Sequence, residues 1–390
     1  MQTKCPYCFG TLVASVAAFA CLSCPPREDA EAAKYRGSPV QGPPVIIIQT
    51  PAGSRDARPT SARCPTCKTA SYAQACPDCH ATLPPRWLDT STTCIALAGT
   101  TYSGKSVYIG VAVKQLQILA TMLGSVLTPF NGETATAYAE HYEHKLYVER
   151  GLIGATPRQN TGTVYRHNIP LMYQFANVLG RPQVLVLRDI AGENLADPDL
   201  NPWMFRFFAR ADGIVYLVDP LQIDLIRNQL RGFVPVARRD FVEPVPVLAN
   251  LSRLLLAADP SRPATRVRLA LTLSKFDALQ NLREVDQSTF RKAMSLPGAA
   301  FLRDPSLLST TFDSADSDLL NLEIESLLRE LRAIELLNLA RQTFQDRRWF
   351  AVSALGHQPG DSLGDAGITP FRCLDPIKWI LKENGVLRAS

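Results

Sequence analysis

The amino-acid sequence predicts an α/β fold in which a mainly parallel sheet is covered by helices on both faces and preceded by small cysteine-rich modules. Two observations support this prediction. Short apolar segments alternate with helical stretches from residue 91 onward, a pattern typical of parallel sheets. Eight of the ten cysteines lie within the first 79 residues, in four Cys-x-x-Cys pairs. With 390 residues, 46% of them apolar, the chain can bury one large core beside a small N-terminal module.

The cysteine pairs predict metal sites. One Cys-x-x-Cys pair presents two thiolates to a tetrahedral zinc ion, and a second pair completes a closed structural site. We therefore expect two zinc ions. The pairs could combine sequentially, within residues 1–24 and within residues 63–86, or cross between the two segments, and disulfides or a redox pair are the competing interpretations. The eight predicted ligands are Cys5, Cys8, Cys21, Cys24, Cys64, Cys67, Cys76 and Cys79.

Composition shifts along the chain predict its domain organisation. We expect a zinc ribbon or the first half of a zinc module, a flexible linker rich in proline and glycine, a second zinc ribbon, and a large α/β domain with helical insertions. The residues from 314 to 344 predict one long amphipathic helix. In the same order, these segments are residues 1–24, 25–62, 63–86 and 91–390, with insertions at about 133–150, 220–266 and 278–344.

Charge and hydropathy narrow the choice of partners. The formal net charge is +5, and no block of lysine and arginine resembles a nucleic-acid-binding arm. The zinc modules leave nucleic acid open as a partner, but the charge of the chain does not support it. The first residues lack the pattern of a signal peptide, so we expect a cytoplasmic protein. Because Lys114, Gln115 and Gln117 interrupt the apolar residues 107–127, we expect no insertion into a membrane.

The apolar segments of the large domain predict its strands, and the first of them leads into a glycine-rich loop. That loop fits G-x-x-x-x-G-K-[ST], the phosphate-binding loop of P-loop NTPases, after a predicted strand and before a predicted helix. A chance glycine turn is the alternative. The predicted strands are residues 94–98, 164–174, 183–187, 213–218, 267–273 and 349–352, and the loop is Gly99-Thr100-Thr101-Tyr102-Ser103-Gly104-Lys105-Ser106.

The loop residues have predicted roles toward a nucleotide. Its glycines let backbone N–H groups face the phosphates, and the helix N-terminus adds partial positive charge. Lys105 is expected to bridge the β- and γ-phosphates, and the Ser106 hydroxyl to bind Mg²⁺. The backbone contacts are expected from Gly99, Ser103, Gly104 and Val107.

Three further motifs follow in order along the chain. An apolar strand ends in Asp189-Ile190-Ala191-Gly192, which has the form Asp-x-x-Gly. A later strand ends in Ser274-Lys275-Phe276-Asp277, and the last predicted strand ends in Ser353-Ala354. Together with the phosphate loop, these motifs resemble those of the TRAFAC-class Ras-like GTPases.

The resemblance implies roles for these residues. Asp189 would hold Mg²⁺ through a water, and the Gly192 N–H would contact the γ-phosphate. Asp277 would accept two hydrogen bonds from guanine, with the Lys275 stem along the base. The Ala354 N–H, beside Ser353, would contact the guanine carbonyl. Ser274 stands where the family usually has Asn or Thr, which weakens its expected hydrogen bond to the phosphate loop.

Two catalytic residues are also implied by the resemblance. A switch threonine would bind Mg²⁺ beside the γ-phosphate, and Thr156 is our first choice, with Thr161 and Thr163 as rivals. Glu193 follows Asp-x-x-Gly where many Ras-like proteins have a water-orienting glutamine. An ionised carboxylate accepts but cannot donate a hydrogen bond, so we expect slow hydrolysis unaided by a partner. Alternatively, Glu193 caps the following helix.

A narrower resemblance is to bacterial GTPases fused to zinc ribbons, including double-GTPase families. It is based on the Cys-Pro-x-Cys pairs, the Cys79-His80 junction, the helical insert at 133–150 and the segment 374–380. It implies GTP or GDP, Mg²⁺ and two Zn²⁺ as ligands, a protein effector or a second GTPase as partner, and a role in bacterial conflict or defence. The alternatives are a zinc-ribbon adaptor that binds nucleotide without hydrolysis, and an ATPase.

Overall fold

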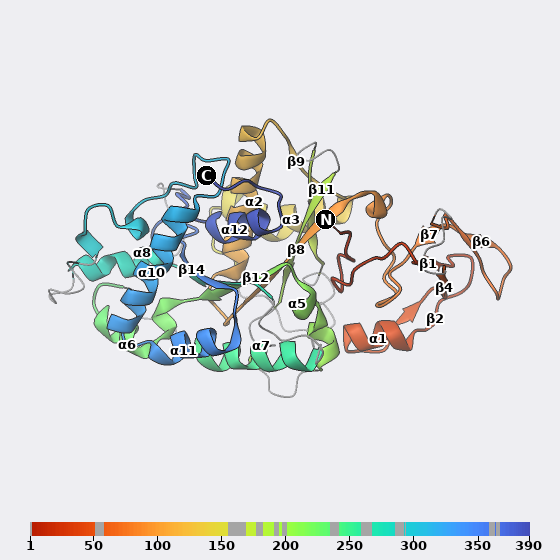
Figure 1. Ribbon diagram of the computed structural model, residues 1–390, viewed down its shortest axis with the longest axis horizontal. Helices are drawn as coiled ribbons and strands as arrows, with labels where there is room; N and C mark the ends of the chain where they lie inside the picture. The colour runs from red at the N-terminus through yellow and green to blue at the C-terminus, as the bar shows by residue number, and fades with distance from the viewer. Residues whose placement is uncertain are drawn as a thin grey trace.

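The computed structural model describes residues 2–50, 58–154, 169–176, 182–190, 195–196, 201–234, 242–258, 267–284, 292, 294–358, 363 and 367–390. Short strands near the N-terminus form a small lobe at one end of the molecule, and a large α/β domain forms the rest (Figure 1). Among the described residues, no helix has the length and apolar character needed to cross a membrane.

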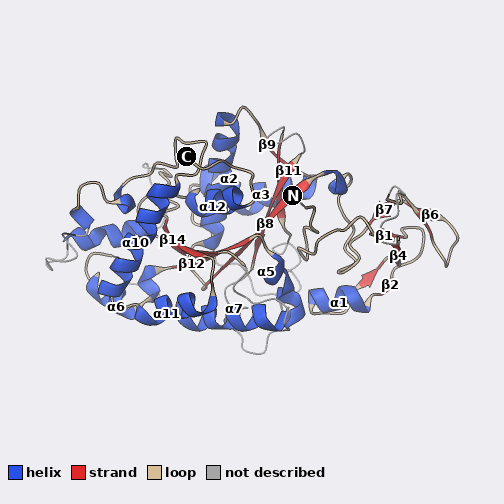
Figure 2. Cartoon of the chain, viewed as in Figure 1, coloured by secondary structure: helices blue, strands red, loops and turns tan. Residues whose placement is uncertain are grey.

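The large domain contains one seven-stranded sheet, seen edge-on among the helices in Figure 2. Five neighbouring strands are parallel, and the last two pair antiparallel at one edge. The sheet is therefore mainly parallel, as predicted. In spatial order its strands are β14 (Arg347–Ala351), β13 (Leu269–Leu273), β12 (Gly213–Val218), β8 (Ser91–Gly99), β11 (Gln183–Asp189), β10 (Leu171–Phe175) and β9 (Leu127–Pro129).

The central strands form because their apolar residues are covered on both sides. All residues of β8 and β12 are buried, and such strands are near-continuous runs of Val, Ile, Leu and Ala rather than alternating sequences. The predicted strand at 213–218 has the bounds of β12. Of the strand predicted at 164–174, residues 164–168 lie outside the described part of the chain. The short edge strand β9 was not predicted.

The principal helices of the large domain pack against this sheet and each other. Helix α12 contacts β12 and β8, helix α7 contacts β8 and α11, and α10 contacts β14. These helices are α2 (Lys105–Met122), α3 (Gly132–Tyr138), its π-helical continuation η2 (Ala139–Val148), α7 (Pro244–Ala258), α10 (Ser314–Glu330), α11 (Ile334–Thr343) and α12 (Asp375–Glu383).

Shorter helical segments connect these elements. They are α5 (Arg206–Arg210), α6 (Asp224–Gln229), α8 (Phe276–Gln280), and the 3-10 turns η1 (Trp87–Asp89), η4 (Pro202–Phe205), η5 (Pro220–Gln222), η7 (Asn281–Glu284) and η8 (Ala300–Leu302).

The prediction of one long helix for residues 314–344 is wrong, because two helices, α10 and α11, occupy this stretch. Arg332 has a φ of 59°, in the left-handed region where helices commonly end. The Ala333 N–H then donates a 2.8 Å hydrogen bond back to the Leu328 carbonyl. This turn separates α10 from α11, so the apolar faces of the two helices pack separately.

The N-terminal lobe joins segments that are distant in the sequence. Its three-stranded sheet has the order β4 (Val45–Gln49), β1 (Val16–Ala20), β7 (Ala73–Gln74), and all five residues of β4 pair with β1. Beside it lie two hairpins and one helix. These are β2 (Arg27–Glu28) with β3 (Gln41–Gly42), β5 (Ala62–Arg63) with β6 (Ala70–Ser71), and α1 (Ala30–Arg36).

Residues 25–62, for which a flexible linker was expected, thus contain a helix and strands in their described part. Asp29 caps α1 by accepting a hydrogen bond from the Ala32 N–H, and Gly37, with a φ of 72°, ends it. Ile46 and Ile48 of β4 pack against a small core that includes Phe19. The apolar residues 45–48 thus belong to a strand within the stretch for which a linker was expected.

Candidate functional site

The register of the parallel strands brings the predicted nucleotide motifs to one edge of the sheet. Leu97 of β8 pairs with Asp189 of β11, and Gly99, the last residue of β8, pairs with Leu217 of β12. Leu273 of β13 pairs with Val218 of β12 on one side and with Ala351 of β14 on the other. All four motifs therefore follow strand ends at the carboxyl edge, where ligands of open α/β sheets bind.

The phosphate loop has a backbone that requires glycine at two positions. Gly99 has a φ of 142°, and a Cβ atom there would lie 2.4 Å from the Leu217 carbonyl oxygen. Gly104 has a φ of 87° and is the N-cap of α2. A strand, a tight loop and a helix N-terminus therefore follow one another here, an arrangement that suits an anionic ligand.

The side chains of the loop are largely buried. Lys105 donates hydrogen bonds to the carbonyls of Gly99 (3.2 Å) and Thr100 (2.9 Å). The Ser103 hydroxyl donates to the Thr100 carbonyl at 2.8 Å. Ser106 and Val107 lie half-buried in the first turn of α2. The lysine side chain thus points back across the loop.

Gln222 supports the loop from a neighbouring strand end, and sequence analysis did not identify it. It lies in η5, just after β12, and is 1% exposed. Its Nε2 donates a 2.7 Å hydrogen bond to the Thr101 carbonyl, and its Oε1 accepts a hydrogen bond from the Thr100 hydroxyl. One buried amide therefore holds two successive loop residues. No local motif marks this residue in the sequence.

Asp189, the last residue of β11, has a carboxylate suited to a cation. Its Oδ1 is buried without a hydrogen-bond partner among the described residues. Burial raises the pKa of the carboxyl group to about 6, against a smaller opposite effect of Lys105. An acceptor left unpaired in this way fits a magnesium ion or its bound water.

The two residues predicted to act with Asp189 at the γ-phosphate, Gly192 and Glu193, lie outside the described residues. So do Thr156 and its rivals Thr161 and Thr163. Their catalytic roles stay predictions.

The Ser274–Asp277 motif follows β13. The Ser274 hydroxyl donates to the Val218 carbonyl at 3.2 Å. Lys275 has a φ of 50° and forms a 2.6 Å ion pair with Asp219, which is 2% exposed. Ser274, which was expected to form a hydrogen bond to the phosphate loop, therefore bonds to the end of β12 instead. Gln222 makes the hydrogen bonds to the loop.

Asp277 and Ser353 meet across the ends of β13 and β14. The Ser353 hydroxyl donates a 2.6 Å hydrogen bond to Asp277 Oδ1 and accepts one of 2.9 Å from the Gly356 N–H. Burial raises the pKa of Asp277, whereas the bond from Ser353 lowers it. Ala354, half-buried, is next to Ser353. The two motifs predicted to contact the base therefore lie together.

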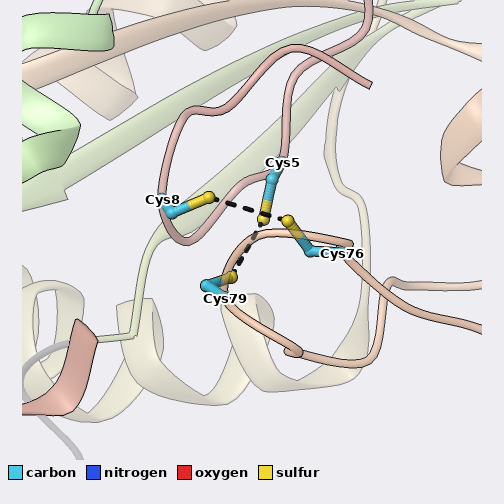
Figure 3. Close-up of side chains that lie close together, drawn as sticks. All are labelled: Cys5, Cys8, Cys76 and Cys79. Carbon is cyan, nitrogen blue, oxygen red and sulfur yellow. Dashed lines mark hydrogen bonds between the residues drawn. The ribbon is translucent and has the colours of Figure 1, made fainter. Parts of the chain in front are cut away.

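The first cysteine cluster joins the two ends of the N-terminal region. The sulfur atoms of Cys5, Cys8, Cys76 and Cys79 point toward one another (Figure 3). The Sγ atoms of Cys5 and Cys79 are 3.7 Å apart, as are those of Cys8 and Cys76. Four sulfurs placed about 2.3 Å from a tetrahedral zinc ion would be about 3.8 Å apart. This cluster can hold one zinc ion.

The second cluster uses the remaining four ligands, Cys21, Cys24, Cys64 and Cys67. Neighbouring sulfurs here are separated by 3.5 to 3.8 Å, which also fits tetrahedral zinc. The pairs therefore cross between the two segments, an alternative that sequence analysis had left open. Crossing follows from the lobe's fold, because β7 pairs antiparallel with β1. Residues that precede β1 therefore lie near residues that follow β7, and residues that follow β1 lie near residues that precede β7.

The two clusters differ in their surroundings. Cys5, Cys8, Cys76 and Cys79 belong to the main hydrophobic core of the large domain, whereas Cys21, Cys24 and Cys64 form a small separate core. The first cluster is thus a junction between the lobe and the α/β domain. Outside the two clusters, Cys94 and Cys373 are buried.

Comparisons with solved structures return distant likenesses. The bacterial selenocysteine-specific elongation factor EF-Sec has a TM-score of 0.28 and 13% identity over 75% of this chain and 29% of its own. The S. cerevisiae Ski7 GTPase-like domain, bound to GTP, has a TM-score of 0.31 and 11% identity over 76% of this chain and 50% of its own. Sup35 complexed with GMPPNP has a TM-score of 0.24 and 12% identity over 69% of this chain and 39% of its own. This chain thus spans half or less of the length of each of these proteins.

Comparisons of sequence give a much nearer relative. No protein-family model matches the chain. It is 41% identical over 364 residues to a protein of Mycolicibacterium smegmatis (strain ATCC 700084 / mc(2)155) named "Putative ESX-1 scaffolding and assembly protein SaeC", and the match covers 92% of each chain. This identity over nearly the full length of both proteins shows that the chain belongs to the SaeC family.

Proposed function

We propose that this chain binds guanine nucleotides, hydrolyses GTP slowly without a partner, and acts as a nucleotide-dependent switch in protein scaffolding and assembly. The observation that carries the proposal is the alignment of the phosphate loop, Asp189, Asp277 and Ser353 at one carboxyl edge of the sheet. Scaffolding and assembly come from the name of the SaeC relative. A role in bacterial conflict or defence stays a separate, untested prediction.

The fold supports this assignment. Helices α12 and α7 both contact β8 and lie on opposite sides of the strands in Figure 1. We infer that helices cover both faces of the sheet, as in P-loop NTPases. Ligand binding is then confined to the carboxyl edge, because the faces are closed.

Phosphate binding would use groups already aimed at the loop. Lys105 would exchange its bonds to loop carbonyls for bonds to the β- and γ-phosphates. Ser106 and Asp189, with Thr156 as the predicted switch residue, would hold Mg²⁺, and the unpaired Oδ1 of Asp189 fits that role. When bound, Mg²⁺ neutralises negative charge on the two phosphates.

Base recognition would use the pair formed by Asp277 and Ser353. A carboxylate can accept two hydrogen bonds from the ring N–H and amino group of guanine, which adenine does not offer together. The bond from Ser353 fixes one oxygen of Asp277, and the Ala354 N–H would face the guanine carbonyl. Guanine preference over adenine follows.

A second candidate is a scaffold that binds nucleotide without turnover, which the relative's name favours. Multiple-turnover GTP hydrolysis separates the two functions. Glu193→Gln and Glu193→Ala should change the single-turnover rate if Glu193 positions water. Equal rates in both variants and the wild type, with and without a cellular extract, would remove Glu193 from the mechanism.

The nucleotide class is tested by competition. ATP and GTP are titrated against one fluorescent guanine nucleotide analogue bound to the zinc-loaded protein in the presence of Mg²⁺. We expect GTP and GDP to displace it and ATP to do so only at far higher concentration. Equal displacement by ATP would show that the site does not select guanine and that the Asp277 motif is accidental.

The zinc clusters complete the proposal. Two zinc ions would fix the N-terminal lobe, which is too small to fold stably without metal. We infer that the lobe contacts a protein partner, such as an effector or a second GTPase, in the cytoplasm. The net charge of +5, with no block of lysine and arginine, gives no support to nucleic acid as that partner.

A further inference from the structure

Arg188 connects the first cysteine cluster to the strand that ends in Asp189. Successive side chains of a strand point to opposite faces, so Arg188 points away from the side of Asp189. Its Nη1 donates a hydrogen bond to the carbonyl of Tyr7, which lies between Cys5 and Cys8. Its guanidinium is 3.9 Å from the ring centroid of Phe207 in α5. The metal-binding turn, β11 and α5 therefore meet at one side chain.

Arg210 makes a second connection from the end of α5. Its Nη1 forms a 2.8 Å ion pair with Asp78 and lies 3.8 Å from the sulfur of Cys8. Asp78 lies between Cys76 and Cys79. One arginine thus contacts both Cys-x-x-Cys turns of the first cluster.

Packing strengthens this attachment. Phe9 and Phe207 make an edge-to-face contact with ring centroids 5.5 Å apart. Lys4 donates to the Arg210 carbonyl at 2.8 Å and pairs with Asp212 at 2.6 Å. Asp212 in turn accepts a 2.8 Å hydrogen bond from the Cys94 N–H in β8. The first cluster and Lys4 beside it therefore contact residue 188 on one side and residues 210 and 212 on the other.

Charge makes this attachment depend on the metal. One Zn²⁺ with four thiolates carries a net charge of about −2, whereas four thiols carry none. The guanidinium groups of Arg188 and Arg210 carry positive charge. Hydrogen bonds and contacts to an anionic site are stronger than those to a neutral one. The loaded cluster should thus hold both guanidinium groups more firmly than the empty one.

The second cluster has a different environment. Its Cys67 sulfur lies 2.8 Å from the Thr69 hydroxyl, and its small core is separate from the main one. It therefore provides a comparison within the same molecule.

We propose that Arg188 and Arg210 are positioning residues that transmit zinc loading of the first cluster to β11 and α5. Zinc bound by Cys5, Cys8, Cys76 and Cys79 thereby fixes the position of Asp189 and raises nucleotide affinity. Only the effect on affinity depends on the proposed function. The effect on β11 and α5 does not.

The structural part is tested by hydrogen exchange without nucleotide. The full chain, loaded with zinc, is compared with Arg188→Met and Arg210→Ala. Methionine keeps apolar contact with Phe207, and alanine favours the helix. We expect faster amide exchange in residues 183–190 and 202–210 of each variant, with two zinc ions retained. Arg341→Met, which removes an ion pair with Glu325 between α10 and α11, is the matched control and should leave exchange in both segments unchanged.

Wild-type exchange in both Arg188→Met and Arg210→Ala would overturn the proposal. If Arg188→Met fails to fold, Arg188→Lys retains the charge and should keep intermediate protection. Equal loss of protection in Arg341→Met would also overturn the proposal, because the effect would then be general destabilisation.

The nucleotide part is tested by GTP titration of the same proteins. We expect Arg188→Met and Arg210→Ala to bind GTP about tenfold more weakly, within the usual range for coupled sites. Cys8→Ser and Cys24→Ser disable one cluster each, and the larger loss of GTP affinity should come from Cys8→Ser. Equal losses would contradict the coupling. If the wild type itself does not bind GTP, the proposed function fails, whereas the exchange experiment still decides the structural link.

Discussion

The hydroxyl of Ser353 donates a 2.6 Å hydrogen bond to the Oδ1 atom of Asp277, across a separation of 76 positions in the sequence. Parallel pairing of β13 with β14 makes this contact possible, since it aligns Leu273 with Ala351. Each residue follows the end of its strand within a few positions. Two motifs that are individually common in sequences thus form one polar unit.

Asp277→Asn should move nucleotide preference from guanine toward xanthine. The amide of asparagine presents a donor where the carboxylate presents an acceptor. The variant should therefore prefer a base with an acceptor at that place, and xanthine has a carbonyl where guanine has its amino group. We expect GTP affinity to fall by a factor of about 5 to 150, since an unpaired buried polar group costs about 1–3 kcal/mol. Competition between GTP and xanthosine triphosphate measures the change. Unchanged selectivity for GTP would show that Asp277 does not read the base.

Asp189→Asn should affect stability and magnesium binding in opposite directions. The raised pKa of Asp189, about 6, means that the folded protein without nucleotide binds a proton there more tightly than the unfolded chain. This stabilisation is present below the ordinary carboxyl pKa and is lost as pH rises through about 6.

The variant should therefore be more stable at pH 7 than the wild type without nucleotide, by about 1–3 kcal/mol, yet bind nucleotide with little dependence on Mg²⁺. Thermal unfolding at pH 4.5 and pH 7, and nucleotide titration with and without Mg²⁺, check both effects. A variant that is destabilised at pH 7 and retains magnesium-dependent binding contradicts this role.

Gln222→Ala should loosen the phosphate loop. It leaves the Thr101 carbonyl and the Thr100 hydroxyl without the buried amide that they contact, at a cost of about 1–3 kcal/mol. We expect faster nucleotide dissociation, followed with a fluorescent analogue. Thr100→Val removes one of the two contacts without changing side-chain shape much, so the double variant should lose less than the sum of the single losses. Strictly additive losses would mean that Gln222 acts elsewhere.

Each chain should contain two zinc ions. Eight cysteines form two clusters whose sulfur spacing fits tetrahedral zinc, and neither a ribbon nor a hairpin of this size is stable alone. Elemental analysis of protein purified without chelator should give two, and Cys64→Ser should reduce the value to one. A zinc content of zero in the wild type would refute both metal sites.

Much of the large domain could be predicted because its signals are local. A run such as the one in β12 is apolar throughout and bounded by polar residues, so its limits are evident in the sequence. The phosphate loop is recognisable because Gly99 and Gly104 adopt backbone angles that other residues avoid. In both cases a few adjacent residues contain the whole signal.

Other features depend on contacts between distant residues. The crossed cysteine pairs follow from the pairing of β1 with β4 and β7, and two-residue strands such as β7 have no sequence pattern of their own. Gln222 is polar, is buried and follows no motif, so its contacts to Thr100 and Thr101 depend on the fold around it. The break between α10 and α11 occurs at Arg332, a residue that ordinarily favours helix.

Calorimetric titration of the zinc-loaded protein with GTP and Mg²⁺ tests whether this edge of the sheet is a guanine-nucleotide site. The wild type should bind one GTP per chain. Lys105→Ala should lose at least about tenfold in affinity, since a charged hydrogen bond contributes about 1.5–3 kcal/mol, with its thermal unfolding still cooperative. A folded Lys105→Ala variant that binds GTP as tightly as the wild type would exclude the proposed phosphate site, and a wild type that binds no GTP would exclude a guanine-nucleotide site at this edge.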